Sequence, residues 1–103
     1  MSLTEIERGD TYKITNIYYS GAVAAWPVSA NVTLYDPNGT AIFTDKSGVR
    51  TGTTGEFYYH ISTNSTHDLG IWIAKWTGGV NYGVAWGILP STYRNVFQLV
   101  KVD

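Results

Sequence analysis

The stretch that decides the fold is Val28-Ser29-Ala30-Asn31-Val32-Thr33-Leu34-Tyr35-Asp36-Pro37-Asn38-Gly39. Up to Tyr35 it alternates apolar and polar side chains, the pattern of a strand that buries one face and exposes the other. We expect the apolar side chains at positions 28, 30, 32 and 34 to point inward. The residues from Asp36 to Gly39 predict a β-turn, because Pro fixes φ, the Asp side chain bonds its own backbone, and Gly tolerates a positive φ. The stretch therefore predicts a strand that ends in a hairpin.

Similar strand patterns occur on both sides of this stretch. Upstream, Tyr12, Ile14 and Tyr18 share one side of a segment rich in β-branched and aromatic residues. With the strand at 28–35, the predicted strands cover 11–19, 41–45, 55–62, 70–76, 80–86 and 95–102. Gly78-Gly79 predicts a turn, and Ser91-Thr92 predicts a break between strands. About seven short strands with turn residues between them predict an all-β fold of two antiparallel sheets packed face to face.

Composition supports this fold class. The chain has 103 residues, the length of one domain; 15% of them are charged, 15% are aromatic, and 11 are glycine. So few charges and so many aromatic residues are typical neither of a disordered chain nor of a helical bundle. Residues 1–10 are polar and are interpreted as a lead-in segment, with the domain at 11–103.

Charge and cysteine content exclude several classes of function. Seven Lys and Arg residues against eight Asp and Glu residues give a net charge of −1, so we expect no binding to nucleic acid. The chain has no cysteine, which excludes disulfides and cysteine-based zinc sites. The uncharged run at 14–35 contains too many polar residues to cross a membrane, and no secretory signal pattern stands at the N-terminus. We therefore expect no membrane insertion.

Residues capable of catalysis or metal binding form no recognisable pattern. His60 and His67 have no third ligand at a suitable spacing, and Asp36 lacks the spacing of a calcium-binding loop. No serine stands in a nucleophile-elbow context, and no pair of carboxylates stands out. The sequence therefore predicts a protein that is not an enzyme and that uses neither a cofactor nor a metal.

Aromatic residues are the best candidates for binding. The core of a 103-residue sandwich cannot hold all of Trp26, Tyr35, Tyr58, Trp76, Tyr82, Trp86 and Tyr93. Because a strand buries alternate residues, inward-pointing Phe57 and Tyr59 would leave Tyr58 outside. In the same way, inward-pointing Trp72 and Trp76 would leave Ile71 and Ile73 outside. The predicted contact surface consists of Tyr58, Trp76, Tyr82 and Trp86. An exposed aromatic surface of this kind would bind a neighbouring domain, a second copy of the chain, or a sugar ring stacked on indole.

Four motifs occur in a familiar order. They are Val-Thr-Leu-Tyr-Asp-Pro-Asn-Gly-Thr at 32–40, Gly-Glu-Phe-Tyr-Tyr at 55–59, Gly-Ile-Trp-Ile-Ala at 70–74 and Val-Phe-Gln-Leu-Val at 96–100. This order resembles the immunoglobulin-like and macroglobulin-like β-sandwich modules of bacterial, archaeal and phage surface proteins. The resemblance covers residues 11–102 and implies a single immunoglobulin-like β-sandwich. It further implies a non-catalytic spacer, adhesion or interaction module of an extracellular, cell-surface or virion protein.

Several alternatives remain open at this stage. Neighbouring domains or other proteins would be the partners of such a module. A carbohydrate-binding module would instead hold a glycan on Trp76, Tyr82 and Trp86, with Asn81 and Asn95 bonding sugar hydroxyls. A phage structural subunit would associate weakly with its own copies through sheet edges. Immunoglobulin-like and transthyretin-like strand orders both fit the predicted strands.

Overall fold

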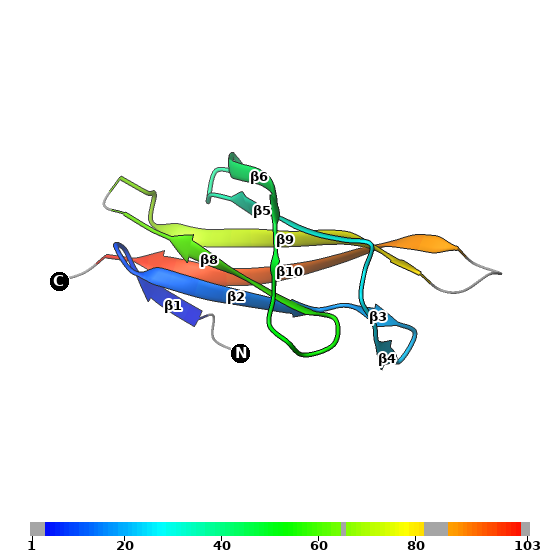
Figure 1. Ribbon diagram of the computed structural model, residues 1–103. Helices are drawn as coiled ribbons and strands as arrows, with labels where there is room; N and C mark the ends of the chain where they lie inside the picture. Colours follow the sequence, from blue (N-terminus) through cyan, green and yellow to red (C-terminus); the bar gives the residue numbers. More distant parts are fainter. Residues whose placement is uncertain (1–3, 65, 82–86, 102–103) are drawn as a thin grey trace.

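The computed structural model describes residues 4–64, 66–81 and 87–101, and within them the chain is all-β with several sheets and no helix (Figure 1). The strands are β1 (Thr4–Glu7), β2 (Thr11–Ile17), β3 (Tyr19–Ser20), β4 (Val23–Ala24), β5 (Ser29–Tyr35), β6 (Ala41–Ser47), β7 (Val49–Arg50), β8 (Glu56–Ser62), β9 (Gly70–Asn81) and β10 (Ile88–Val100). A five-stranded sheet has the order β1-β10-β9-β5-β6, a three-stranded sheet has the order β2-β8-β7, and β3 pairs with β4. The predicted all-β class is confirmed.

A long hairpin of β9 and β10 forms the centre of the larger sheet. The register of this pair runs from Ile88 opposite Asn81 to Leu99 opposite Gly70. The molecule as a whole measures 54 × 26 × 25 Å. The predicted turn at Gly78-Gly79 and the predicted break at Ser91-Thr92 are both wrong, since each pair lies inside a strand. A Cβ at Gly78 would lie 2.2 Å from the carbonyl oxygen of Ser29. Glycine is required here by a close approach of two strands, not by a turn.

The strand and hairpin predicted from the opening stretch are present as β5 and β6. The Oδ1 atom of Asp36 accepts hydrogen bonds from the backbone N–H groups of Asn38 and Thr40, each at 2.9 Å, and Gly39 has a φ of 84°. The predicted inward residues of β5 are buried, namely Ala30, Val32 and Leu34. Val28 was expected beside them but is 63% exposed, because it precedes β5 and its side chain lies near Gly79.

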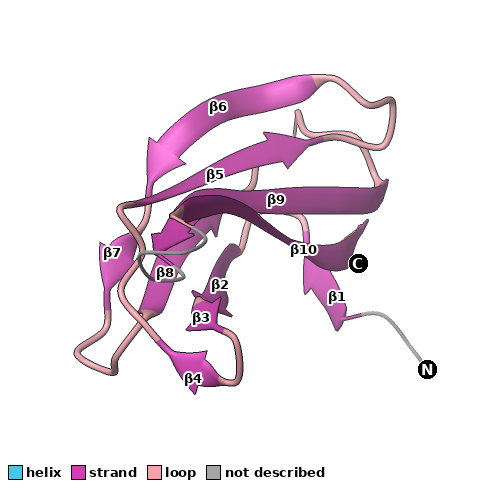
Figure 2. Ribbon diagram, turned by 90° about the vertical axis from the view of Figure 1, so that its right-hand side faces the viewer, coloured by secondary structure: helices cyan, strands magenta, loops and turns pink. Residues whose placement is uncertain are grey.

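The two larger sheets share one core and pack face to face (Figure 2). Rings meet across them, with centroids 5.1 Å apart for Tyr12 and Phe97 and 5.2 Å apart for Phe43 and Tyr59. The most deeply buried large side chains come from both sheets and the segment after β2: Trp72, Trp76, Tyr18, Phe97, Ile14, Leu34 and Leu99. The predicted alternation holds in β9, where Trp72 is buried while Ile71 is 41% exposed.

The chain crosses between these sheets in the region predicted as the loop at 46–54. There β6 continues to Ser47, and β7 begins in the other sheet after the single residue Gly48. A Cβ at Gly48 would lie 2.8 Å from the Cζ3 atom of Trp76. The crossing therefore closes directly over the buried indole ring.

Residues 4–7 of the predicted lead-in form β1, which lies at the edge of the larger sheet. It pairs in parallel with the end of β10, from Thr4 opposite Phe97 to Glu7 opposite Val100. Ile6 packs against the core, and this contact stabilises the docking of an otherwise polar segment. Among the described residues, no strand pairs with the part of β10 before Phe97 along the edge where β1 pairs with the end of β10. None of the described residues belongs to a helix that could cross a membrane.

Candidate functional site

The aromatic surface predicted from the sequence is not present as a unit. Trp76 was expected to be exposed, and this is wrong: its exposed fraction is 0%, and its Nε1–H donates to the Oδ1 atom of Asn95 at 2.8 Å. The physical reason is the space that Gly48 leaves above its ring. Tyr82 and Trp86 lie outside the described residues.

Tyr58 is half-buried on β8, in the smaller sheet. The Nζ atom of Lys13 lies 4.9 Å from its ring centroid, and the ring of His60 lies 5.3 Å away. A cation over an aromatic ring at an exposed site contributes about 0.5–1 kcal/mol, so these neighbours hold the Tyr58 ring in place. Since Trp76 is enclosed and Asn95 is bonded to it, neither residue forms the sugar-stacking site considered above.

The two histidines are separate in the structure. His60 is exposed, whereas the Nδ1 atom of His67 accepts a hydrogen bond from the backbone N–H of Asn64 at 3.1 Å and its ring packs on Trp72 at 5.3 Å. In the part of the chain that the structure describes, no three histidine or acidic side chains gather in a group that could hold a metal ion. His67 therefore closes a loop over the core.

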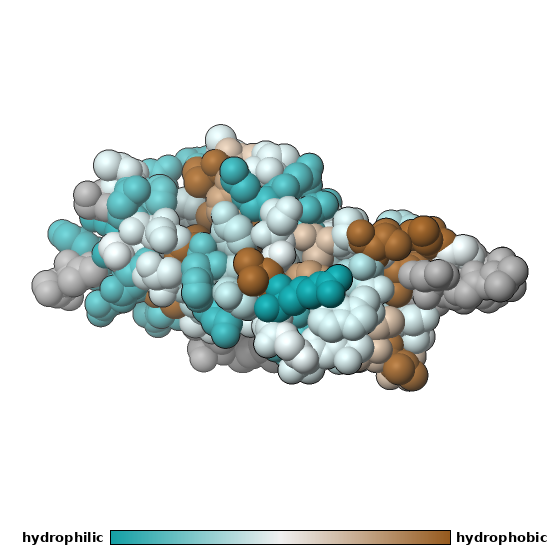
Figure 3. All heavy atoms as spheres, in the orientation of Figure 1, coloured by the Kyte–Doolittle hydropathy of each residue, from teal (hydrophilic) through white to brown (hydrophobic). Residues whose placement is uncertain are grey.

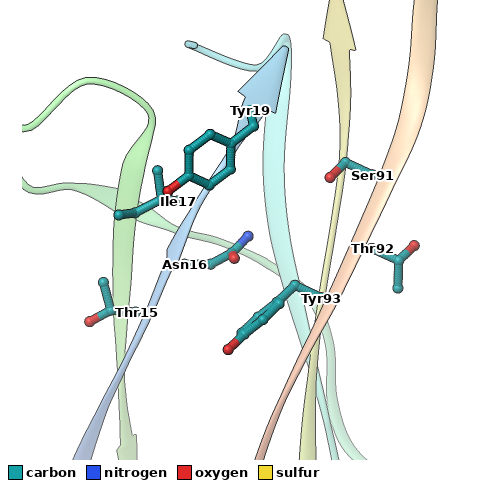
Figure 4. Close-up of a pocket in the computed structure, with 7 residues that line it drawn as sticks. All are labelled: Thr15, Asn16, Ile17, Tyr19, Ser91, Thr92 and Tyr93. Carbon is teal, nitrogen blue, oxygen red and sulfur yellow. The ribbon is translucent and has the colours of Figure 1, made fainter. Parts of the chain in front are cut away.

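A groove of about 490 Å³ lies between β2 with the start of β3 on one side and β10 on the other (Figure 4). Its lining consists of Thr15, Asn16, Ile17, Tyr19, Ser91, Thr92 and Tyr93. The ring of Tyr93 projects from its strand toward the β2 side, Asn16 lies between the strands, and Tyr19 stands at the β3 end (Figure 4). The exposed fractions of Tyr93 and Tyr19 are 50% and 47%, so both rings are accessible from solvent.

The walls of the groove are sheet edges. β2 pairs with β8 on one edge only, and the part of β10 ahead of Phe97 pairs with β9 on one edge only, as far as the described strands go. The groove is therefore the place where the two sheets of the fold both end. Its lining side chains carry hydroxyl, amide, aromatic and aliphatic groups, and no charged group is among those that the structure describes.

The floor of the groove continues into the core through Asn16 and Tyr18. Burial raises the pKa of the Tyr18 phenol above its ordinary value, and a hydrogen bond with the Asn16 side chain partly opposes this effect. The Tyr18 hydroxyl donates to the carbonyl oxygen of Thr77 at 3.0 Å, which ties the strand segment after β2 to β9. The phenol is thus neutral at ordinary pH, and the described lining of the groove offers hydrogen bonding and ring contact.

Hydrophobic residues gather at the same end of the molecule. Figure 3 shows them in brown where β10 begins and near the β3–β4 hairpin, while much of the remaining visible surface is hydrophilic. The exposed apolar residues there are Val23, Val28, Ile88 and Leu89. Trp26 is exposed as well, with the guanidinium carbon of Arg50 4.5 Å from its ring centroid.

The groove residues were missed by sequence reasoning. Ser91 and Thr92 were interpreted as a break between strands, and no predicted role was given to Thr15 or Tyr19. Their shared position depends on which strands lie at the sheet edges, and the pattern within a single strand does not contain that information. Exposed Tyr93, in contrast, belongs to the aromatic residues that the alternation argument could not fit into the core.

Comparisons with protein-family models, with curated proteins and with solved structures found no match to this chain.

Proposed function

We propose that this chain is a non-catalytic, immunoglobulin-like module that acts as a load-bearing spacer and interaction domain of an extracellular, cell-surface or virion protein. The strand order supports the immunoglobulin-like alternative. In variable-type immunoglobulin domains one sheet contains strands G, F, C and C′ and the other contains B, E and D. Here β10-β9-β5-β6 and β2-β8-β7 have the corresponding order.

The observation that carries the spacer role is the parallel pairing of the first and last strands. Thr4 lies opposite Phe97 and Glu7 lies opposite Val100, so the chain enters β1 and leaves β10 at opposite ends of the pair (Figure 1). A force that pulls the two chain ends apart acts along these strands. It loads the hydrogen bonds between them together, in shear, instead of opening them one after another.

The backbone geometry indicates which residues would bear such a load. The N–H of Arg8 donates to the carbonyl oxygen of Val100 at 2.8 Å. Because the backbone groups of successive strand residues point to opposite sides, Ile6 also directs its N–H toward β10, whereas Glu5 directs its N–H away. A proline at position 6 therefore removes a bond between the strands, and a proline at position 5 does not.

Single-molecule force spectroscopy tests this proposal. Tandem copies joined through their N- and C-termini are stretched, as wild type and as Ile6→Pro, Glu5→Pro and Ile6→Ala. We expect Ile6→Pro to lower the unfolding force most. Ile6→Ala keeps the N–H and loses only side-chain packing, and Glu5→Pro leaves the bond between the strands in place. Equal unfolding forces for Ile6→Pro and Glu5→Pro would refute the load-bearing role.

A further inference from the structure

The open edges beside the groove present backbone groups as well as side chains. Val100 directs its carbonyl toward β1, so by strand alternation Arg94 and Thr92 direct their N–H and C=O groups toward the same edge. On the other wall, the N–H of Tyr18 donates to Gly55 beside β8 at 2.9 Å. Ile17 and Thr15 consequently point their backbone groups away from β8, toward the groove.

Pro90 fits this geometry. A proline is tolerated in a strand only where its missing N–H would have faced an unpaired edge. By the alternation just described, position 90 belongs to the residues whose backbone faces away from β9. As far as the described strands go, the start of β10 is therefore a sheet edge whose backbone acceptors and donors face no partner strand, and it continues in line with the edge that β1 covers.

We infer that this groove binds an extended peptide strand of a partner protein, which pairs with β10 between Ile88 and Tyr93 and covers the edge of β2. Strand addition to an exposed edge draws its affinity from main-chain hydrogen bonds and its specificity from side-chain pockets. The site extends the pairing that β1 already makes with the other part of β10. The load-bearing role proposed above does not depend on this site.

The lining indicates the chemistry of the peptide. None of the described side chains that line the groove is charged, and most carry a hydroxyl or an amide. An uncharged segment of alternating threonine or serine and β-branched residues would match them, with Tyr19 and Tyr93 packing on its side chains. A strand of about six residues, roughly 20 Å long, would span the edge from Ile88 to Tyr93.

The groove favours a single strand over a second copy of the chain. Two sheet edges flank it, so an occupant must fit between them. A second copy would bring a whole sheet with its facing sheet, and this is too bulky to enter between the two edges.

The test uses nuclear magnetic resonance spectra of the full chain titrated with a capped hexapeptide of alternating threonine and valine. We expect amide shifts concentrated at Thr15, Ile17, Thr92 and Arg94, and slower hydrogen exchange at Thr92 and Arg94. Two N-methylated hexapeptides are the matched ligand controls. The N-methyl groups lie along one edge of the peptide strand in the first and along the opposite edge in the second, so each peptide can donate main-chain hydrogen bonds from one edge only. The one that cannot bond to β10 should bind at least tenfold more weakly.

Protein variants give an independent readout. Thr92→Pro removes an edge N–H and should weaken hexapeptide binding at least tenfold. Thr92→Ala keeps that N–H and loses only the side-chain contact in the groove, so it should weaken binding by a smaller factor. If Thr92→Pro fails to fold, the N-methylated hexapeptides decide the question on the unaltered protein. Three results would overturn the inference: no shifts with the hexapeptide, the same shifts with a panel of oligosaccharides instead, or the same shifts on raising the concentration of the protein alone.

Discussion

Replacing Gly78 by alanine should destabilise the fold strongly, while the same change at the adjacent Gly79 should not. An added Cβ at Gly78 points into the core, 2.2 Å from the carbonyl oxygen of Ser29 and 2.9 Å from the Cε2 atom of Tyr18. Contacts of Cβ atoms below 3.0 Å essentially do not occur, so Cβ and oxygen must separate by at least 3.0 − 2.2 = 0.8 Å. That oxygen belongs to the backbone of β5, which cannot rotate away as a side chain can.

The free energy of unfolding should fall by about 3 kcal/mol in Gly78→Ala. Overpacking a core costs about 1–3 kcal/mol, and weakening one or two hydrogen bonds between β5 and β9 costs about 1 kcal/mol each. Replacing a glycine within a strand returns roughly 0.5–1 kcal/mol by reducing the freedom of the unfolded chain. At Gly79 the added Cβ would lie 2.8 Å from the Cγ2 methyl of Ile88 and 3.0 Å from that of Val28, and rotation about χ1 of these exposed side chains can relieve both contacts. Gly79→Ala should therefore stay within about 1 kcal/mol of wild type.

Urea unfolding followed by tryptophan fluorescence measures both changes, because Trp72 and Trp76 are buried and report on the core. For a domain of about 100 residues, a loss of 3 kcal/mol corresponds to a fall in melting temperature of roughly 12–24 °C. The dependence of the free energy on urea should remain unchanged if the unfolded state is the same. Equal destabilisation by the two substitutions, or a Gly78→Ala variant as stable as wild type, would refute the close approach of β5 and β9.

Two further predictions concern buried polar groups. Asn95→Ala should lower the free energy of unfolding by about 1–3 kcal/mol, because it leaves the buried indole N–H of Trp76 unpaired. The loss should be smaller in a Trp76→Phe background. An equal loss in both backgrounds, measured by urea unfolding, would contradict this prediction. Burial raises the pKa of Tyr18 in the folded state. The contribution of Tyr18 to the free energy of unfolding should therefore be fully present below the unfolded pKa of about 10 and should decrease as pH rises beyond it. Between pH 8 and 11 the melting temperature of Tyr18→Phe should fall less than that of the wild type. The variant should nevertheless have a lower melting temperature at pH 8, because it lacks the hydrogen bond to Thr77. Identical dependence of the melting temperature on pH in the two proteins would contradict this.

Local patterns were sufficient to predict the strand at β5, its hairpin turn and the alternation of buried and exposed residues in β9. Each of these depends on side chains close together in the sequence, such as Asp36 with Asn38 and Thr40. Glycines were harder to interpret, because the same residue serves a turn and a close approach between strands. Gly39 has a positive φ in a turn, whereas Gly78 lies in the middle of β9 beneath Tyr18.

The candidate site depended on information that no single segment contains. Trp76 is buried because Gly48, in a different part of the chain, leaves room for its ring. Thr15 and Thr92 line one groove because β2 and β10 are both edge strands where they lie, and this follows from the sheet order. Counting aromatic residues indicated that some must be exposed, but it could not distinguish enclosed Trp76 from accessible Tyr93.

The pairing of β1 with β10 has a consequence for how the protein is made. It joins residue 4 to residue 97, so the larger sheet can be completed only after residue 97 has left the ribosome. Until then Ile6 has no partner strand and the edge of β10 does not exist. Because contacts between distant parts of a chain form slowly, we expect β1 to dock last, from an otherwise assembled β-sheet core.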